Sequence, residues 1–487
     1  MLEPNNKLRL ARQLKHWSQE RAAAEIGVDR KTYVRWENGL NYPQSGTLDL
    51  LCKAFDLPTE DLGFSDIFQR SSPRAVTHNL EPVFQSVPST GMSDVSTQIS
   101  LKLAQILHMM SIWGKQGFFY SEIQTMIDEE IRMLDETLQQ QQTREDYRIS
   151  RRQALATLAA LPTAVLTWKQ PGQSSVVVPE EFLPQCAASI TACWHLLKGD
   201  GLVAVEQILP KYVPTLTNLA LQSSQHQQMA AYLAAQANIL QAITAMHRLN
   251  IAGREKYCQT AIQCGYLSKD PKITAAALMY LGYTYSFCYR PRRPAQAIQK
   301  FLEALRVLGE EDSLIRSDIM MGLAEAYAQC REESNALKYI TLAQNHFPTY
   351  PDSDPSFLYA ECGLNVLYQW EGKMYLELGE HYRDRGYQQK AWDAIVISAG
   401  TQSITERATN ETIIYQADAA RLLGDLTTYT EYVREGTQMA LVLGSQKRFD
   451  EAHEVYQKTP ESWRGEQAIK VLAKEFFRHL PMRRGTS

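Results

Sequence analysis

The 487-residue sequence is poor in the features that mark loop-rich, disordered or disulfide-bonded proteins. It has only 25 glycines and 20 prolines, which argues against a loop-rich β architecture and against wholesale disorder. Its eight cysteines form no C-x-x-C pair and no zinc-knuckle spacing, so we interpret them as small core residues of a reducing compartment. The length fits about three domains, or one small module joined to a repetitive array.

Long hydrophobic runs are also missing. The first residues show no apolar run after a basic start, so no signal peptide is expected. One apolar stretch, residues 154–166, follows Arg151 and Arg152, but it contains Pro162 and is shorter than the roughly 20 residues of a spanning helix. We expect a short buried helix there, and a cytoplasmic protein that makes no membrane contact.

No pattern of catalytic residues stands out. The sequence has no Gly-rich phosphate loop, no H-E-x-x-H and no nucleophile elbow, and its ten histidines include no i, i+4 pair. We therefore expect no enzyme activity, no metal and no cofactor. A hidden hydrolase would need a cluster that the fold assembles from distant residues.

Four zones follow one another along the chain. Residues 1–64 carry short helical patterns with clear caps, and residues 65–98 contain the Ser, Thr and Pro mixture of a flexible linker. Residues 99–168 return to helical periodicity as a connecting region. Residues 180–480 are almost continuously helical in pattern, so the predicted fold class is all-α.

The N-terminal zone reads as a series of short helices. We expect a first helix over residues 7–17, and a second that begins at Gln19 after a serine cap and stops at Gly27. Asp29 then caps a third helix over residues 30–37. Two short helices joined by a turn with glycine form the helix-turn-helix pattern.

This zone resembles the five-helix Cro and phage-repressor (XRE-type) DNA-binding domain over essentially its whole length. Caps, spacing and core positions agree together. The matching residues are Trp17-Ser18-Gln19-Glu20, Ala23, Gly27-Val28, Trp36-Glu37-Asn38-Gly39, Pro43, Leu48, Leu51, Ala54-Phe55-Asp56-Leu57 and Asp61-Leu62. The family usually has a larger residue at Ala22 and a smaller one at Tyr33, so we hypothesise that the Tyr33 ring fills the space left by Ala22.

The resemblance implies that the third helix enters the major groove of double-stranded DNA. Its first residues would read base edges, while the start of the second helix and the backbone after the third would contact phosphates. For each basic side chain a solvated surface position is the alternative. The candidate DNA contacts are Gln19, Arg30, Lys31, Thr32, Arg35 and Asn38.

Local charge favours the same function. Residues 7–36 carry a net charge of +5 and residues 37–64 a net charge of −4, although the whole chain is at −4. A basic face of this kind neutralises phosphates and gives salt-dependent affinity. We assign Tyr33 and Trp36 to the core rather than to this face.

Internal repeats determine how residues 180–480 are interpreted. Gly282, Ala324 and Gly379 each precede a second helix with alanine and a large apolar residue at similar offsets. A small residue lets two antiparallel helices approach, and a larger one fills the space beside it. These positions resemble the tetratricopeptide repeat, which implies an α-solenoid of helix pairs. An irregular helical bundle is the alternative.

A solenoid would offer a concave surface lined by the first helix of each pair. An aromatic patch beside mixed charges there suits an extended peptide, although aromatic residues at helical spacing are also typical of a core. Arg290, Arg292 and Arg293 form a basic turn that either holds a carboxylate or phosphate or is simply exposed. The candidate effector-binding residues are Tyr280, Tyr283, Phe287, Glu325, Gln329 and Lys373.

A Cro-type module followed by tetratricopeptide-like repeats resembles, in layout, the peptide-responsive quorum-sensing regulators of bacteria. The layout implies a homodimeric transcriptional regulator with a peptide or protein effector on its repeats. The competing interpretation is a scaffold whose repeats hold another protein, with the DNA-binding module as an address. The sequence identifies neither the operator nor the effector.

Overall fold

We describe the protein from a computed structural model. The described residues are 19–28, 30–37, 45–55, 120–141, 144–167, 177–310, 312–403 and 405–479, together with Leu8, Arg12 and Lys15. The predicted linker at 65–98 lies outside them. The chain divides into two compact units, residues 1–88 and residues 89–487.

The smaller unit contains the two helices whose ends the caps predict. Gly27, just after the first of them, has φ 83°, the left-handed conformation that glycine adopts without strain. This turn lets the Val28 N–H donate to the carbonyl of Ala23 at 2.9 Å, which closes the helix end. The described helices of this unit are α2 (Gln19–Ile26), α3 (Arg30–Glu37) and α4 (Ser45–Phe55).

One hydrophobic core holds these helices together. Tyr33 and Trp36 are both buried, with their rings edge to face and their centroids 6.3 Å apart, so their assignment to the core is confirmed. Ala22 is fully buried in the same cluster, as the Tyr33 hypothesis requires. The cluster comprises Leu8, Ala22, Ala23, Ile26, Tyr33, Trp36, Leu51 and Phe55.

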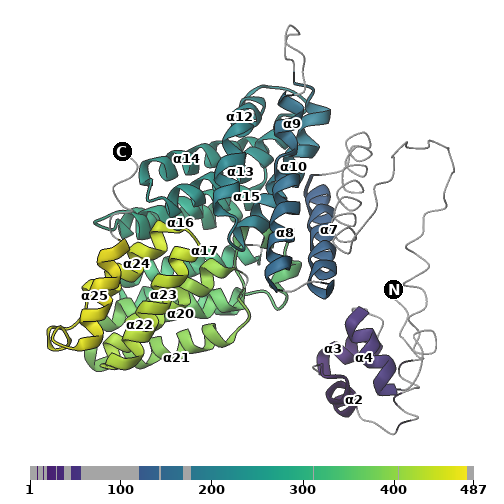
Figure 1. The fold of residues 1–487 in the computed structure, drawn as a ribbon. Coiled ribbons are helices and arrows are strands. Elements are labelled where there is room, and N and C mark those ends of the chain that lie inside the picture. Colours follow the sequence, from purple (N-terminus) through teal and green to yellow (C-terminus); the bar gives the residue numbers. More distant parts are fainter. Residues whose placement is uncertain are drawn as a thin grey trace, which may run out of the picture. The chain divides into compact units, whose positions relative to one another are not determined.

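Every regular element described in the larger unit is a helix, so the all-α prediction is confirmed there (Figure 1). The α-helices are α7 (Tyr120–Gln141), α8 (Arg144–Ala159), α9 (Leu161–Thr167), α10 (Pro179–Leu197), α11 (Leu202–Ile208), α12 (Val213–Leu221), α13 (Gln227–His247), α14 (Ile251–Ser268), α15 (Pro271–Tyr283), α16 (Pro294–Leu308), α17 (Leu314–Gln329), α18 (Glu333–His346), α19 (Phe357–Ala360), α20 (Leu364–His381), α21 (Tyr387–Gly400), α22 (Glu406–Leu423), α23 (Leu426–Val442), α24 (Gln446–Gln457) and α25 (Gln467–His479). Short 3₁₀ or π segments are η1 (Leu209–Lys211), η2 (Thr284–Cys288), η3 (Pro351–Ser353), η4 (Arg383–Arg385) and η5 (Glu461–Trp463).

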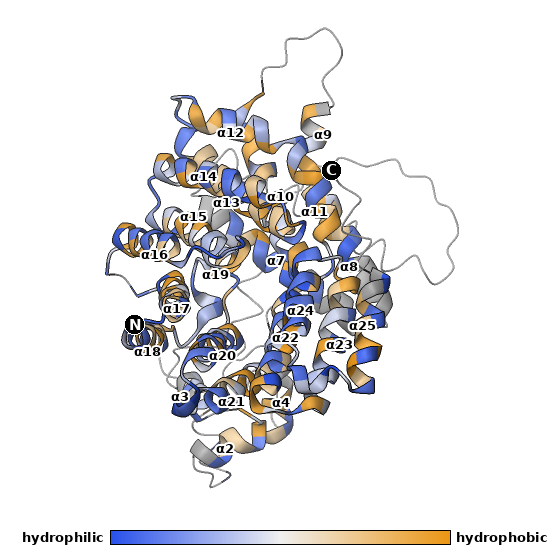
Figure 2. Ribbon diagram, turned by 90° about the vertical axis from the view of Figure 1, so that its left-hand side faces the viewer, coloured by the Kyte–Doolittle hydropathy of each residue, from blue (hydrophilic) through white to orange (hydrophobic). Residues whose placement is uncertain are grey.

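The apolar stretch at residues 154–166 forms two helices rather than the single one predicted. Helix α8 ends at Ala159 and α9 begins at Leu161, because Pro162 fits the first turn of a helix and disrupts an interior one. Leu155 and Leu158 are buried in the same core as α10. Hydrophobic and hydrophilic residues are mixed within the helices (Figure 2), and no described helix is long and apolar enough to cross a membrane.

Consecutive helices pack in pairs, among them α13 with α14, α15 with α16, α17 with α18, and α20 with α21. The predicted small residues differ in what they do. A Cβ at Gly282 would lie 2.6 Å from Phe301 Cε1, whereas a Cβ at Gly379 would have its nearest neighbour at 3.5 Å, on Gln388. The two glycines are therefore not equivalent, contrary to the repeat alignment. Of these two glycines, Gly282 alone is needed for a close approach of the partner helix.

Helices far apart in the sequence also touch. His247 Nδ1, at the end of α13, lies 2.6 Å from Ser445 Oγ, and Lys447 Nζ donates to the carbonyl of Phe287 at 3.2 Å. The Glu406 N–H donates to the carbonyl of Lys198 at 2.9 Å. In an open solenoid each repeat contacts only its neighbours. The predicted solenoid is therefore not confirmed, because α22 and α24 return to the helices that begin the array.

Candidate nucleic-acid interface and ligand cavity

Helix α3 presents the predicted DNA-reading surface. Arg30, its first residue, is exposed, and Thr32, two residues later, is half-buried. Gln19 begins α2, and Lys31 and Arg35 lie on α3, but their side chains are outside the description. Asn38 falls outside the described residues altogether. The predicted DNA contacts thus stay predictions, placed on helices whose ends are as expected.

A buried ion pair fixes the far end of α3. Arg12 Nε lies 2.6 Å from Glu37 Oε1 and Arg12 Nη2 lies 3.3 Å from Glu37 Oε2, while the Glu37 side chain is fully buried. Paired with this carboxylate, the Arg12 guanidinium has a raised pKa, chiefly because it hydrogen-bonds to Glu37. Beside them, burial raises the pKa of the Tyr33 hydroxyl. The pair joins the region before α2 to the last residue of α3.

Not every cation of the basic stretch faces outward. Arg12 is committed to Glu37, and Lys15 Nζ donates to the carbonyl of Ala54 at 2.9 Å. Arg21 and Glu25 form an exposed i, i+4 pair at 3.8 Å on α2. The charge available to phosphates is therefore smaller than the net +5 of residues 7–36.

Residues 8–62 match the helix-turn-helix family model. The match spans all three described helices of the smaller unit and confirms the helix-turn-helix prediction. It supports a DNA-binding regulator of the XRE type. No curated protein and no solved structure matches the chain. The larger helical unit therefore has to be understood from its own contacts.

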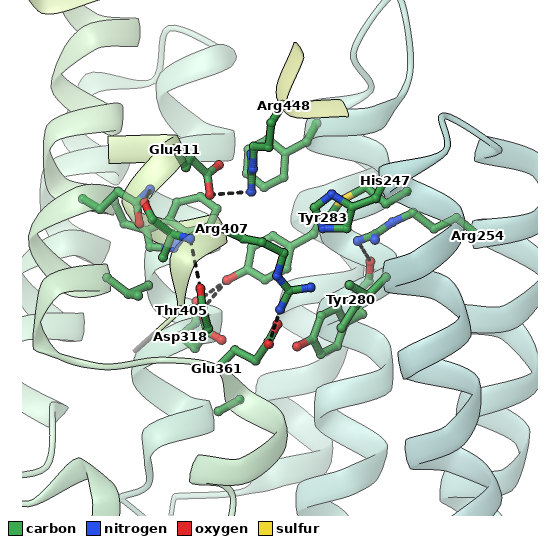
Figure 3. Close-up of a pocket in the computed structure, with 18 residues that line it drawn as sticks. His247, Arg254, Tyr280, Tyr283, Asp318, Glu361, Thr405, Arg407, Glu411 and Arg448 are labelled. Carbon is green, nitrogen blue, oxygen red and sulfur yellow. Dashed lines mark hydrogen bonds and ion pairs between the residues drawn. The ribbon is translucent and has the colours of Figure 1, made fainter. Parts of the chain in front are cut away.

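Three of the six predicted effector residues line a cavity of about 140 Å³ in the larger unit (Figure 3). Tyr280 and Tyr283 come from α15, and Phe287 from η2. The Tyr283 ring stacks on Phe287 and on Trp370 of α20, with centroid distances of 5.5 and 5.1 Å. Both tyrosines are buried, and the Tyr280 hydroxyl donates to the carbonyl of Tyr359 at 3.0 Å. These rings form the aromatic wall of the cavity.

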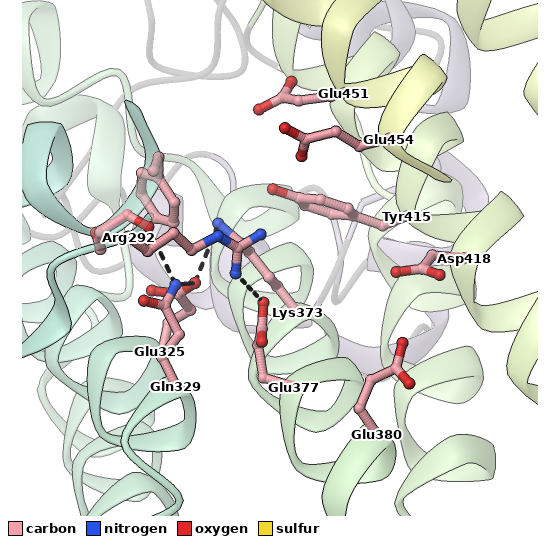
Figure 4. Close-up of polar contacts among 12 residues, drawn as sticks. Arg292, Glu325, Gln329, Lys373, Glu377, Glu380, Tyr415, Asp418, Glu451 and Glu454 are labelled. Atoms are coloured by element: carbon pink, nitrogen blue, oxygen red, sulfur yellow. Dashed lines mark hydrogen bonds and ion pairs between the residues drawn. The ribbon is translucent and has the colours of Figure 1, made fainter. Parts of the chain in front are cut away.

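The other three predicted residues form a polar cluster beside that wall (Figure 4). Lys373 Nζ lies 3.5 Å from Glu325 Oε1 and 3.2 Å from the centre of the Phe287 ring. Gln329 hydrogen-bonds to Glu325 and donates to the carbonyl of Ser286 at 3.2 Å. Burial raises the pKa of Glu325 and lowers that of Lys373. The structure thus brings all six residues together, with four of them buried and Phe287 and Gln329 half-buried.

The basic turn holds carboxylates of the chain itself. Arg290 Nε lies 2.6 Å from Glu454 Oε1 on α24, and Arg292 pairs with Glu377 on α20. The Arg293 guanidinium lies over the Tyr289 ring, 3.7 Å from its centre. This turn is therefore a junction between helices rather than a free anion site.

The cavity also contains charged residues that the sequence did not point out. Arg407 stands at the start of α22, Arg448 on α24 and Arg254 on α14, and all three line the cavity with Asp318 and Glu361. Arg407 pairs with Glu361, and the Tyr283 hydroxyl donates to Asp318. No local pattern could have revealed this group, because its members are spread over about 200 positions and meet only in the fold.

Proposed function

We propose that the chain is a sequence-specific DNA-binding transcriptional regulator whose larger helical unit binds an effector and supports dimerisation. The observation that carries the DNA-binding half is the helix-turn-helix match over residues 8–62, with exposed Arg30 at the start of α3. A dimer would place two α3 helices about 34 Å apart on a pseudo-palindromic operator.

The buried pair of Arg12 and Glu37 supports this role for α3. A recognition helix has to hold its side chains within a fraction of an ångström to distinguish base pairs. A buried two-point ion pair to its last residue restricts its rotation.

The proposed effector binding rests on the cavity, where α22 and α24 meet helices from earlier in the chain. Cavities between helices are common ligand sites, and a ligand there would contact both α15 and α22. Such a ligand would shift the protein from one conformation to another only if it binds the second conformation more tightly than the first.

Selection of binding sites from a randomised duplex pool, with the full chain, tests the proposal. We expect an enriched palindromic sequence and, by analytical ultracentrifugation, two chains on each duplex. Enrichment of no sequence would contradict the proposal. A scaffold with a DNA address would instead give an enriched sequence together with a stoichiometric protein partner on purification.

A further inference from the structure

The cavity described above has one wall of unusual chemistry. It is formed by Arg407, Arg448 and Arg254, which come from three different helices (Figure 3). Buried arginines ordinarily have all their donors satisfied, because an unpartnered N–H in a dry interior loses its hydrogen bonds to water. The three guanidiniums differ in how many of their N–H groups have a hydrogen-bond partner.

Arg407 has the most N–H groups without a partner among the described residues. Its residue is 6% exposed, and its Nη2 contacts the carboxylate of Glu361. Among the described residues, its Nε and Nη1 have no hydrogen-bond partner. Figure 3 shows the guanidinium projecting among Tyr280, Tyr283 and Glu361. Two donors of a fixed positive charge are therefore buried at the lining of the cavity without a partner among the described residues.

Arg448 adds a third such donor. Its Nη2 lies 2.7 Å from Glu411 Oε2 and its Nη1 contacts Glu451, while its Nε has no partner in the part of the chain that the structure describes. Arg254 is 2% exposed and gives its hydrogen bonds to neutral oxygens only, those of Thr284, Ala242 and Tyr280. Among the described residues no carboxylate hydrogen-bonds to Arg254, so no direct partner there neutralises its charge.

The carboxylates lining the cavity compensate for only part of this charge. Glu361 and Glu411 each pair with one arginine. Asp318 is fully enclosed, and burial raises its pKa to about 7, so that it is partly protonated at neutral pH. His247 is buried and its pKa is lowered, chiefly by burial, so it adds no charge. Because Arg448 also contacts Glu451, the lining cation without a carboxylate partner among the described residues is Arg254.

Much of the remaining lining of the cavity is apolar and aromatic. It consists of Tyr280, Tyr283, Phe287 and Trp370, with Ile243 and Val366 beside them. A volume of about 140 Å³ is smaller than the 300 to 1,000 Å³ of drug-sized sites, so the occupant is small. Cationic donors next to aromatic rings fit a molecule with an anionic end and an apolar body.

We propose that this cavity binds a carboxylate attached to a small apolar or aromatic group, with the carboxylate on Arg407 and the apolar group against Tyr283 and Trp370. The proposal deepens the effector role proposed above and rests on it for its regulatory meaning. The same chemistry is offered by a free organic acid and by the C-terminal residue of a peptide. An arginine N–H donates a charge-assisted hydrogen bond to either carboxylate.

Isothermal titration of the full chain with phenylacetate and its neutral analogue phenylacetamide tests the chemistry without any substitution. We expect the acid to bind at least about tenfold more tightly, because hydrogen bonds to a charged group stabilise more than neutral ones. Equal binding of the two probes, or no binding of the acid up to about 10 mM, would overturn the proposal. Glycyl-phenylalanine and its C-terminal amide distinguish a peptide end from a free acid. Preference for the free-carboxyl dipeptide over phenylacetate assigns the site to peptides, and the reverse assigns it to small acids.

The variant Arg407→Met tests whether phenylacetate binds at Arg407, and Arg421→Met is its control. Arg421 lies on the same helix, is similarly buried and has its charge paired with Asp418 and Glu380. We expect Arg407→Met to weaken phenylacetate binding at least about tenfold and Arg421→Met to leave it within a factor of about three. Equal loss in both, with helical content unchanged by circular dichroism, would contradict the assignment.

Operator affinity measured with and without phenylacetate separates the two proposals. Binding of the acid with no change in operator affinity leaves the site standing and refutes its effector role. Failure of the acid to bind refutes the site whatever the chain does on DNA.

Discussion

Phe301 packs against two glycines, and this contact predicts how the helix pairs tolerate a single methyl group. A Cβ at Gly282 of α15 would lie 2.6 Å from Phe301 Cε1, and one at Gly322 of α17 would lie 2.6 Å from Phe301 Cζ. The ring itself is fully buried. Both added methyl groups would meet the same Cε1–Cζ edge of this buried ring, and the one at Gly322 would also lie 2.9 Å from Tyr283 Cε1, so the ring has little free space to move into.

The magnitude follows from two opposing effects. Gly→Ala inside a helix favours folding by about 1 kcal/mol, whereas overpacking a filled core costs about 1 to 3 kcal/mol. With Phe301 unable to move away, we expect Gly322→Ala to lower the free energy of unfolding by about 2 kcal/mol. Gly379→Ala is the matched control, since Gly379 is also helical and buried but has 3.5 Å of room. It should leave stability unchanged or raise it by about 1 kcal/mol.

Urea unfolding of the full-length variants, followed by far-UV circular dichroism, measures the difference. A smaller side chain at the ring position should also rescue the defect. Phe301→Leu should therefore cost less in the Gly322→Ala background than in the original sequence, with a coupling of about 1 kcal/mol or more. Equal free energies of unfolding for Gly322→Ala and Gly379→Ala would contradict the close contact between Gly322 and Phe301.

Two further predictions concern the Arg12 ion pair and a buried histidine. Glu37→Ala should remove the two-point ion pair with Arg12, lower the stability of the smaller unit by about 2 kcal/mol and speed amide exchange in α3, as followed by hydrogen-exchange mass spectrometry. The exposed Glu25→Ala should change exchange little, and similar exchange in the two variants would refute the role of the pair. His195 is buried with Nε2 2.6 Å from Asp128 Oδ1, and burial lowers its pKa to about 4. Between about pH 6.5 and 4 the unfolded chain binds a proton that the native chain does not, so stability is complete above about 6.5 and falls as the pH is lowered, by up to about 3 kcal/mol. His195→Gln should flatten this dependence in urea titrations at pH 7 and pH 5, and an unchanged slope would contradict it.

The sequence predicts features that depend on neighbouring residues. Gly27 determines where α2 ends. The burial of Tyr33 follows from its position on the apolar face of α3. The break at Ala160 was missed because the apolar periodicity continues through Pro162. Gly379 was misassigned because sequence offsets do not reveal how closely the partner helix approaches.

The candidate cavity was predictable only in part. The aromatic wall follows from the i, i+3, i+7 spacing of Tyr280, Tyr283 and Phe287. The cationic wall does not, since Arg407 comes more than 100 positions later and its role depends on α22 returning to α15. The number of its hydrogen-bond partners is a property of the packed structure alone.

The central claim is that α3 reads DNA sequence, and the most direct test compares two charge-matched double variants on the selected duplex. Arg30→Ala with Lys31→Ala removes two cations from the start of α3, whereas Arg21→Ala with Lys53→Ala removes two from elsewhere in the same unit. Fluorescence anisotropy at one fixed salt concentration, on the selected and on a scrambled duplex, gives both affinities. We predict that the α3 variant loses its preference for the selected duplex by about 30-fold or more, while the control loses affinity for both duplexes alike. Retained preference in the α3 variant would contradict the account.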